Sequence, residues 1–277
     1  MRAGTRGGGG SHCGSRPVTL ALLAMASGIV VGCAATTDEP DRLERLFAGD
    51  MVVIDLTHSL SGDMPYWPSR AGNPFTHDTI RAHADGAPAM AAYTTPEHHG
   101  THIDAPVHSA QGQRSVDGLG PADLFGPAAV ISVAQQGRDD PDYLISLEDI
   151  ARWEAAHGEI AAGAVVLLHT GWSEKWPDSI AYRNLDEDGR LHFPGFSEEV
   201  ARFLVDERDI LGIGIDNMSI DLGDFSVHGI TNGAGKFHLE NLANLHLLPA
   251  TGAYLIVAPV KIEGGSGGQV RVFAVVP

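Results

Sequence analysis

The feature that most constrains this chain is a short histidine-rich segment at residues 97–108, which reads EHHGTHIDAPVH. It contains four of the fourteen histidines in a chain of 277 residues. Alternate residues of an extended chain face the same side. Four potential metal ligands in the segment share one parity: His98, His102, Asp104 and His108. We therefore expect three imidazoles and a carboxylate on one side of a short stretch of backbone.

Glycine and proline between these residues allow the segment to bend. His98 and His102 would lie roughly 13 Å apart in a fully extended chain, which is marginal for two ligands of one ion. Gly100 can adopt backbone conformations that other residues resist, and Pro106 sets a second bend. A lone histidine is usually an ordinary surface or core residue, but this combination predicts a metal site. His99 has the opposite parity and is not predicted to bind the metal.

The N-terminal residues predict an export signal rather than part of the fold. Three arginines precede an apolar run from Val18 to Val31, which is too short to span a bilayer as a helix. The run ends in VVGC, which resembles a bacterial lipobox with Cys33 as the lipidated residue. We expect a signal peptide at 1–32, a tether at 33–49 and an exported lipoprotein anchored at Cys33. With an ordinary signal the protein would instead be secreted or periplasmic.

Cysteine usage and charge narrow the possible ligands and partners. The two cysteines are Cys13, which lies in the signal, and Cys33. The mature domain therefore has no thiol for a disulfide or a metal, and any metal site must use histidine and carboxylate. The formal net charge is −17 and the chain has no basic run, so a nucleic acid partner is not expected.

The order of the elements, with strands at both ends and helices between them, predicts an α/β or α+β fold in a single domain at 50–277. Helices are indicated by a serine cap, early acidic residues and apolar periodicity at 146–158 and 197–209. A further short helix is expected near Arg42–Phe47. The apolar and β-branched runs that predict strands cover 51–60, 128–134, 164–171, 210–216, 254–262 and 269–277.

The segment HHGTHIDAPVH is similar to the H-x-G-T-H-x-D-x-P-x-H motif of the cyclase family of metal-dependent hydrolases, which includes bacterial kynurenine formamidases and isatin hydrolases. The likeness covers nearly the whole mature chain. Other stretches that resemble the family are IDLTHSL, MPYWP, GIGIDNMSID, ENLANL and GGSGGQVRVFAVVP. The resemblance implies an α/β domain with one mixed sheet, of the swivelling β/β/α type. It also implies a small-molecule substrate, and a homodimer or higher homo-oligomer.

The resemblance also implies a ligand set. By position its members are His98, His102, Asp104, His108, His228 and Glu240, the last two at the family's spacing of twelve residues. Such a set holds two zinc ions in kynurenine formamidase and one manganese ion in isatin hydrolase. The cofactor implied here is therefore Zn²⁺ or Mn²⁺, as one or two ions.

The implied chemistry is hydrolysis of an amide bond in an aryl-formamide or a cyclic amide. A bound ion acidifies water and polarises the carbonyl group. His108 either passes a proton to the leaving nitrogen or binds a second ion. Glu240 either bridges two ions or acts as a base.

Three residues outside the ligand set are candidates for the substrate pocket. Tyr66 and Trp67 lie on a proline-bounded loop, where they would line a site for a flat substrate or pack beneath the loop. Ser219 lies between Asp216 and Asp221, two acids that would cap turns or orient a metal-binding histidine.

One further motif and two alternative functions remain to be considered. The segment GGSGG at 264–268 formally matches G-x-S-x-G, but no helix pattern and no histidine follow it, so it does not predict a serine hydrolase. An exported lipoprotein that binds metal or ligand without catalysis is an alternative. A lactone hydrolase or cyclase is another.

Overall fold

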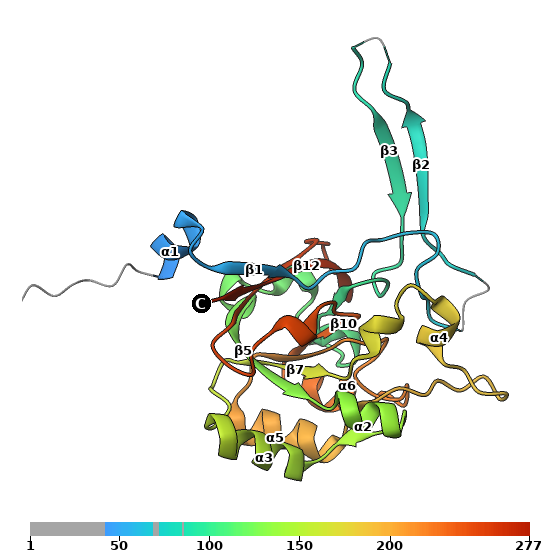
Figure 1. Cartoon of the computed structure of the whole chain (residues 1–277). Helices are drawn as coiled ribbons and strands as arrows, with labels where there is room; N and C mark the ends of the chain where they lie inside the picture. Colours follow the sequence, from blue (N-terminus) through green and yellow to red (C-terminus); the bar gives the residue numbers. More distant parts are fainter. Residues whose placement is uncertain (1–41, 69–71, 85) are drawn as a thin grey trace, which may run out of the picture. The chain divides into compact units, whose positions relative to one another are not determined.

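The computed structural model describes residues 42–68, 72–84 and 86–277 (Figure 1). The predicted signal peptide and Cys33 lie outside the described residues. Seven strands form a closed barrel in the order β12-β11-β5-β7-β9-β10-β4, and β4 pairs with β12 to close it. Their bounds are β4 His102–Asp104, β5 Phe125–Ser132, β7 Val165–His169, β9 Gly212–Ile215, β10 Phe237–Glu240, β11 Tyr254–Pro259 and β12 Gly267–Val276.

The barrel is mixed. The strands β5, β7, β9 and β10 pair with one another in parallel, and every pairing that involves β4, β11 or β12 is antiparallel. β1 (Val52–Asp55) adds to the outer edge of β12. The helices are α1 Arg42–Ala48, α2 Ala134–Asp139, α3 Leu147–His157, α4 Ser179–Arg183, α5 Glu198–Arg208 and α6 Ser226–Gly233. A small parallel pair joins β6 (Leu144–Ile145) to β8 (Gly195–Phe196). The predicted α/β class with a mixed sheet is confirmed.

Strand β7 shows why its sequence is apolar at nearly every position. Val165 and Leu167 belong to the hydrophobic cluster inside the barrel. Val166 and Leu168 belong to the cluster that packs against α3 and α5. A strand covered on both faces has no polar side, which is the usual pattern of parallel strands in α/β proteins.

The two long helices follow their predicted caps closely. In α3 the Ser146 hydroxyl accepts from the Asp149 backbone N–H, and in α5 the Ser197 hydroxyl accepts from the Val200 N–H.

The predicted C-terminal strand begins earlier than expected. Gly267 and Gly268, which the sequence places in a loop, are part of β12 because β4 pairs with them.

One element that the sequence did not predict is the hairpin of β2 (Thr76–Arg81) and β3 (Met90–Thr94). Every residue of both strands is exposed, and neither strand pairs with any other described strand. The strands have no buried face and hence no alternation of apolar and polar residues for a reader to detect. Among the described residues, no helix is both long enough and apolar enough to cross a membrane.

The register of the barrel selects the face on which the predicted metal ligands lie. Ile103 and Leu239 are paired on β4 and β10 and point into the barrel core. Their neighbours in sequence therefore point outward. The same register places His238 opposite Asp104, and Glu240 opposite His102.

Candidate metal centre

The histidine-rich segment bends at Gly100, as the sequence predicts. Gly100 has φ = +66°, a left-handed conformation that favours glycine. A Cβ atom at this position would also lie 2.5 Å from Leu60 Cδ2. After the bend, β4 carries His102 and Asp104, and a short 3₁₀ turn over Pro106–His108 returns His108 towards the cluster.

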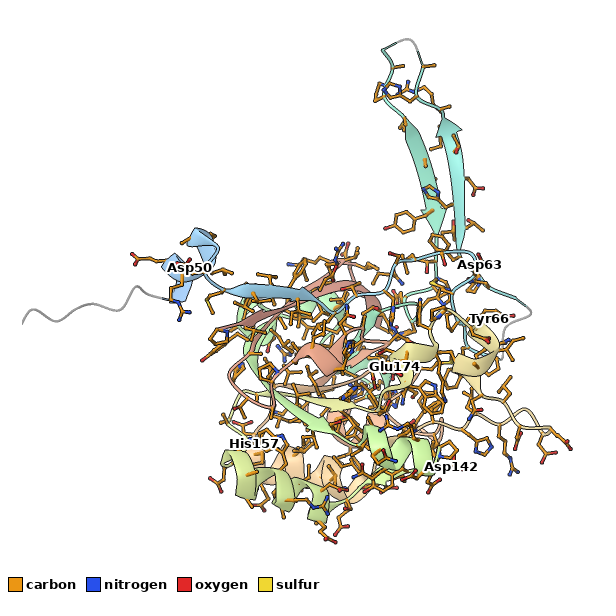
Figure 2. The ribbon with its side chains drawn as sticks, in the orientation of Figure 1. Asp50, Asp63, Tyr66, Asp142, His157 and Glu174 are labelled. Carbon is orange, nitrogen blue, oxygen red and sulfur yellow. The ribbon has the colours of Figure 1, made fainter. Side chains whose placement is uncertain are left out.

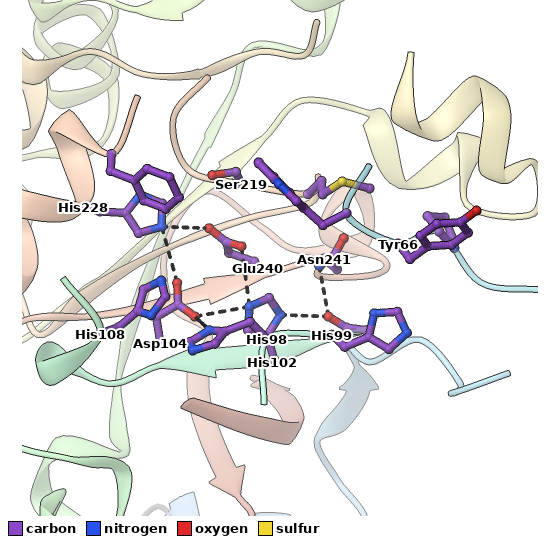
Figure 3. A pocket seen from close by; sticks show the side chains of 15 residues that line it. Tyr66, His98, His99, His102, Asp104, His108, Ser219, His228, Glu240 and Asn241 are labelled. Carbon is purple, nitrogen blue, oxygen red and sulfur yellow. Dashed lines mark hydrogen bonds and ion pairs between the residues drawn. The ribbon is translucent and has the colours of Figure 1, made fainter. Parts of the chain in front are cut away.

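Asp104 is the centre of the cluster, and its side chain is almost completely buried. Its Oδ1 atom lies 2.6 Å from His98 Nδ1 and 3.2 Å from His102 Nε2. Its Oδ2 atom lies 3.5 Å from both His228 Nε2 and His238 Nδ1. Figure 3 shows Asp104 and Glu240 directed towards His102 and His228. One carboxylate therefore faces four imidazoles, two at each oxygen.

Glu240 repeats this arrangement from the neighbouring strand. Its Oε2 atom lies 3.5 Å from His102 Nε2, and its Oε1 atom lies 3.4 Å from His228 Nε2. Two donors bonded to one ion at about 2.1 Å, at angles of roughly 90–110°, lie roughly 3.0–3.4 Å apart. The separations around His102 and His228 are close to these values. The two carboxylates therefore connect two adjacent sets of donor atoms, one around His102 and one around His228.

The outer nitrogens of His98 and His102 are held by oxygen acceptors. Ser266 Oγ donates to Glu97 Oε2 at 2.6 Å, so it accepts from His98 Nε2–H at 2.8 Å. His102 Nδ1–H donates to the Gly100 carbonyl at 2.9 Å. When each ring is neutral, the nitrogen that faces the carboxylates therefore carries the lone pair that a metal ion would bind. Metal-binding histidines typically have their other ring N–H held by an oxygen in this way.

His228 and His238 are held in the same manner from α6 and the loop before it. His228 Nδ1–H donates to Asp221 Oδ2 at 2.8 Å. Thr231 Oγ1 donates to the Val227 carbonyl at 2.8 Å and lies 2.5 Å from His238 Nε2. Lone pairs on nitrogen and carboxylate oxygens that face one another repel unless a cation lies among them, so the donor set fits a divalent metal.

The electrostatics of the cluster also favour positive charge. Burial opposes the charged form of both His102 and His228, but the nearby carboxylates outweigh it. They raise the pKa of His102 to about 9 and the pKa of His228 to about 12. Protons and metal ions therefore compete for the same nitrogens, and metal binding should weaken as the pH falls.

A cavity of about 280 Å³ opens over the cluster. Its walls include the metal-facing side chains of His98, His102, Asp104, His108, His228 and Glu240. The remaining lining residues are Pro65, Tyr66, Trp67, His99, Gly100, Met218, Ser219, Phe225 and Asn241. A concave, largely apolar site with a few convergent polar groups is typical of small-molecule binding.

The family model described as "Putative cyclase" matches residues 54–222. The chain belongs to the putative cyclase family. The isatin hydrolase of Roseibium aggregatum is 36% identical over 252 residues, which cover 84% of this chain and 95% of that protein. The structure of isatin hydrolase A from Ralstonia solanacearum has a TM-score of 0.80 at 37% identity, covering 88% of this chain and 100% of that one. The kynurenine formamidase of Salinibacter ruber is 28% identical and covers 80% of this chain and 96% of that protein.

The structure of this cyclase-family chain brings together every residue of the ligand set inferred from the sequence. His108 differs from the others. It forms one candidate metal-binding group with His98 and Asp104. However, its ring is tilted against the His98 ring at 3.9 Å, centroid to centroid, and no described residue hydrogen-bonds to the ring. Burial lowers the pKa of His108 to about 4. His99 lies on the cavity wall but in none of the groups that could hold an ion, in keeping with its parity.

The two acids near Ser219 have different roles. Asp216 accepts from the backbone N–H and hydroxyl of Thr170 and from the Gly171 N–H, which stabilises a turn. Asp221 orients His228 through Nδ1 and also stabilises a turn by accepting from the Gly223 N–H. Turn capping therefore describes both acids, and the orientation of a histidine describes Asp221 alone.

The sequence analysis missed His238, which the structure places in one candidate group with Asp104 and His228. A signal was present. His238 and Glu240 have the same parity, so a strand over 237–240 puts both on one face.

Substitution of a ligand at the centre should remove most of the bound metal. We expect His102→Ala and Asp104→Ala each to lose most of the metal content of the native protein, because each deletes a donor shared within the cluster. Elemental analysis of purified protein measures this directly. His99→Ala is the matched control and should keep the native content. Full metal content in both cluster variants would contradict the site.

Proposed function

We propose that this protein is a metal-dependent hydrolase of a non-peptide C–N bond, and that its substrate is an aryl-formamide or a cyclic amide. The observation that carries the proposal is a cluster of two carboxylates and three imidazoles on the wall of a small cavity, beside His108, whose ring has no hydrogen-bond partner among the described residues. The names of the similar proteins, isatin hydrolase and kynurenine formamidase, support both substrate classes.

The cofactor is proposed to be Zn²⁺ or Mn²⁺, bound as two ions. Asp104 Oδ1 faces the imidazoles of His98 and His102, and Glu240 Oε2 also faces that of His102. The other two carboxylate oxygens face the imidazole of His228. When bound, a divalent ion supplies Lewis-acid activation of water and of the substrate carbonyl. Nitrogen and oxygen donors suit either metal.

Glu240 and His108, the two residues inferred to take part in the reaction, differ in their contacts. Glu240 directs both carboxylate oxygens at ligand histidines, which favours its role as a bridge between ions rather than as a base. His108 lines the cavity, and its ring forms no hydrogen bond with any described residue. We assign to His108 the transfer of a proton to the leaving nitrogen, because that role needs a ring nitrogen that can reach the substrate.

The pocket fits a flat substrate. Tyr66, Trp67 and Phe225 supply aromatic walls, and Tyr66 lies at the far side of the cavity from His228 in Figure 3. No described residue hydrogen-bonds to the Ser219 hydroxyl, which lines the cavity and can donate to a substrate oxygen. Asn241 is less available, because its amide donates to the Gly100 carbonyl and accepts from the Tyr182 hydroxyl.

The test is a substrate panel of N-formyl arylamines, cyclic amides and lactones, run with metal-reconstituted protein. We expect hydrolysis of a member of the first two classes, and a fall in kcat of about 100- to 10,000-fold in His108→Ala, the usual contribution of a positioned acid or base. His157→Ala, at an exposed residue of α3, should keep native turnover. No turnover of the panel by fully metal-loaded protein would favour the non-catalytic binding alternative, and turnover of lactones alone would favour the lactone hydrolase.

The proposed location is outside the cytoplasm, at a membrane, through a lipid on Cys33. The VVGC sequence after a short apolar run supports this. We expect Cys33→Ala, expressed in a Gram-negative host, to leave the membrane fraction, as followed by immunoblotting. Cys13→Ala is the control, because that residue precedes the apolar run. Membrane retention of the Cys33 variant equal to that of the native protein would rule out lipidation there.

We also propose that the protein is a homodimer or a higher homo-oligomer, with the β2–β3 hairpin at the contact between copies. Ile80, Met90 and Tyr93 of the hairpin are 61%, 52% and 57% exposed, and Figure 2 shows side chains along both of its strands. Light scattering should give a mass of at least two chains, and Ile80→Asp combined with Tyr93→Asp should lower it. Ile180→Asp, at an exposed apolar residue of α4, should leave the mass unchanged. A monomeric native protein would contradict this proposal.

A further inference from the structure

We propose that His238 is a further ligand of the metal centre and binds through Nδ1 the ion that faces His228 and Asp104 Oδ2. The sequence motif and the family's ligand positions do not include this residue. The inference rests on the proposed two-ion centre, because His238 faces only the donor set around His228 and Asp104 Oδ2.

The position of His238 is set by the sheet rather than by a mobile loop. It lies in the middle of β10, directly opposite Asp104 of β4. Its Nδ1 atom is 3.5 Å from Asp104 Oδ2, the same separation that His228 Nε2 has from that oxygen. The rings of His228 and His238 lie 4.9 Å apart at 87°. Asp104, His228 and His238 thus offer three donor atoms within 4.8 Å of one another.

The hydrogen bonds of the other ring nitrogen indicate which nitrogen of His238 carries the proton. Thr231 Oγ1 gives its single hydrogen to the Val227 carbonyl at 2.8 Å. It must therefore accept from His238 Nε2–H, which lies 2.5 Å away. The Asn232 side-chain nitrogen is a longer contact at 3.3 Å, and it donates to the Lys236 carbonyl at 2.9 Å. With the proton on Nε2, the Nδ1 atom carries a lone pair.

That lone pair has no partner in the protein. His238 is completely buried, and no described residue forms a hydrogen bond with Nδ1. The atom it faces is a carboxylate oxygen, which is also an acceptor. Buried polar atoms in native proteins are nearly always satisfied, and two buried acceptors directed at one another require a cation or a proton between them. A metal ion at this point would satisfy both atoms.

The location of His238 is compatible with an active centre. His238 does not line the cavity, and its outer nitrogen is held from α6 by Thr231. His228 and Glu240, which share the same donor set, do line it. A ligand beneath the centre leaves the cavity side open for water and substrate, which a catalytic ion requires.

The competing role is that of a positioning residue, in which His238 would carry its proton on Nδ1 and hold Asp104 by a hydrogen bond. The two roles differ in what the metal senses. A direct ligand changes the coordination number and ligand field of the bound ion, whereas a positioning residue changes only its affinity. The measurement must therefore report the ligand field as well as the affinity.

The experiment is a titration of the metal-free protein with Co²⁺, followed by calorimetry and by the visible d–d absorption of the bound ion. We expect the native protein to bind two equivalents. His238→Leu, which replaces the imidazole with an apolar side chain of similar size, should bind the first as the native protein does and the second at least 100-fold more weakly, with an altered absorption spectrum. Thr231→Val should weaken the second ion about 10- to 100-fold and keep the native spectrum at saturation.

Matched controls and a second measurement keep the outcomes separate. His99→Leu should match the native protein in both equivalents. In the native protein loaded with Zn²⁺, nitrogen NMR of the histidine rings should show Nδ1 of His238 shifted as a metal-bound nitrogen, and this needs no variant to fold.

The failures of the two proposals are distinguishable. Two equivalents with unaltered spectra in His238→Leu, or a His238 Nδ1 signal unchanged by Zn²⁺, would overturn the role of His238 and leave the two-ion centre standing. A single equivalent in the native protein would overturn the two-ion centre, and the inference about His238 with it.

Discussion

The structure around the cavity depends on one buried carboxylate, that of Asp104. An isolated charge at 1% exposure is strongly unfavourable, so its surroundings must compensate for it. The compensation comes from four imidazoles, two at each oxygen, and the pKa of Asp104 lies well below its usual range despite burial. A site that holds a bare carboxylate in this way is preorganised for cations.

The position of Asp104 follows from the closure of the barrel. β4 has three residues and lies between β10 and β12, so it has neighbours on both sides. Gly214 of β9 makes room inside, because a Cβ atom there would lie 2.8 Å from Leu167 Cδ2. A shift of one residue in the register of β4 would turn Ile103 outward and the two ligands into the apolar core. The hydrophobic pattern of the barrel therefore also fixes the direction of the metal ligands.

The orientation of the histidine rings depends on the ring nitrogens that point away from the carboxylates. Ser266, the Gly100 carbonyl, Asp221 and Thr231 come from four separate parts of the chain, and each holds one ring so that the opposite nitrogen faces the carboxylates. The glycines of the segment GGSGG serve this arrangement. A Cβ atom on Gly267 would lie 2.6 Å from His98 Cε1. The segment resembles a nucleophile motif in sequence, but here it contacts a ligand histidine.

Much of the fold and of the site follows from local sequence. Apolar runs and serine caps predicted the buried strands and the helices α3 and α5, and parity predicted a common direction for His102 and Asp104. These features depend on neighbours in the chain, so a linear pattern carries them. The hairpin β2–β3 lacks such a pattern because both of its faces are exposed.

Only the tertiary structure brought His238 to Asp104. The two residues are far apart in sequence, and strand parity shows that His238 shares a face with Glu240 without showing what that face meets. The pairing of β10 with β4 decides it. The same holds for the acceptors Thr231 and Ser266, whose hydroxyls are ordinary in sequence. They acquire a role because the folded chain places each within hydrogen-bonding distance of one particular ring nitrogen.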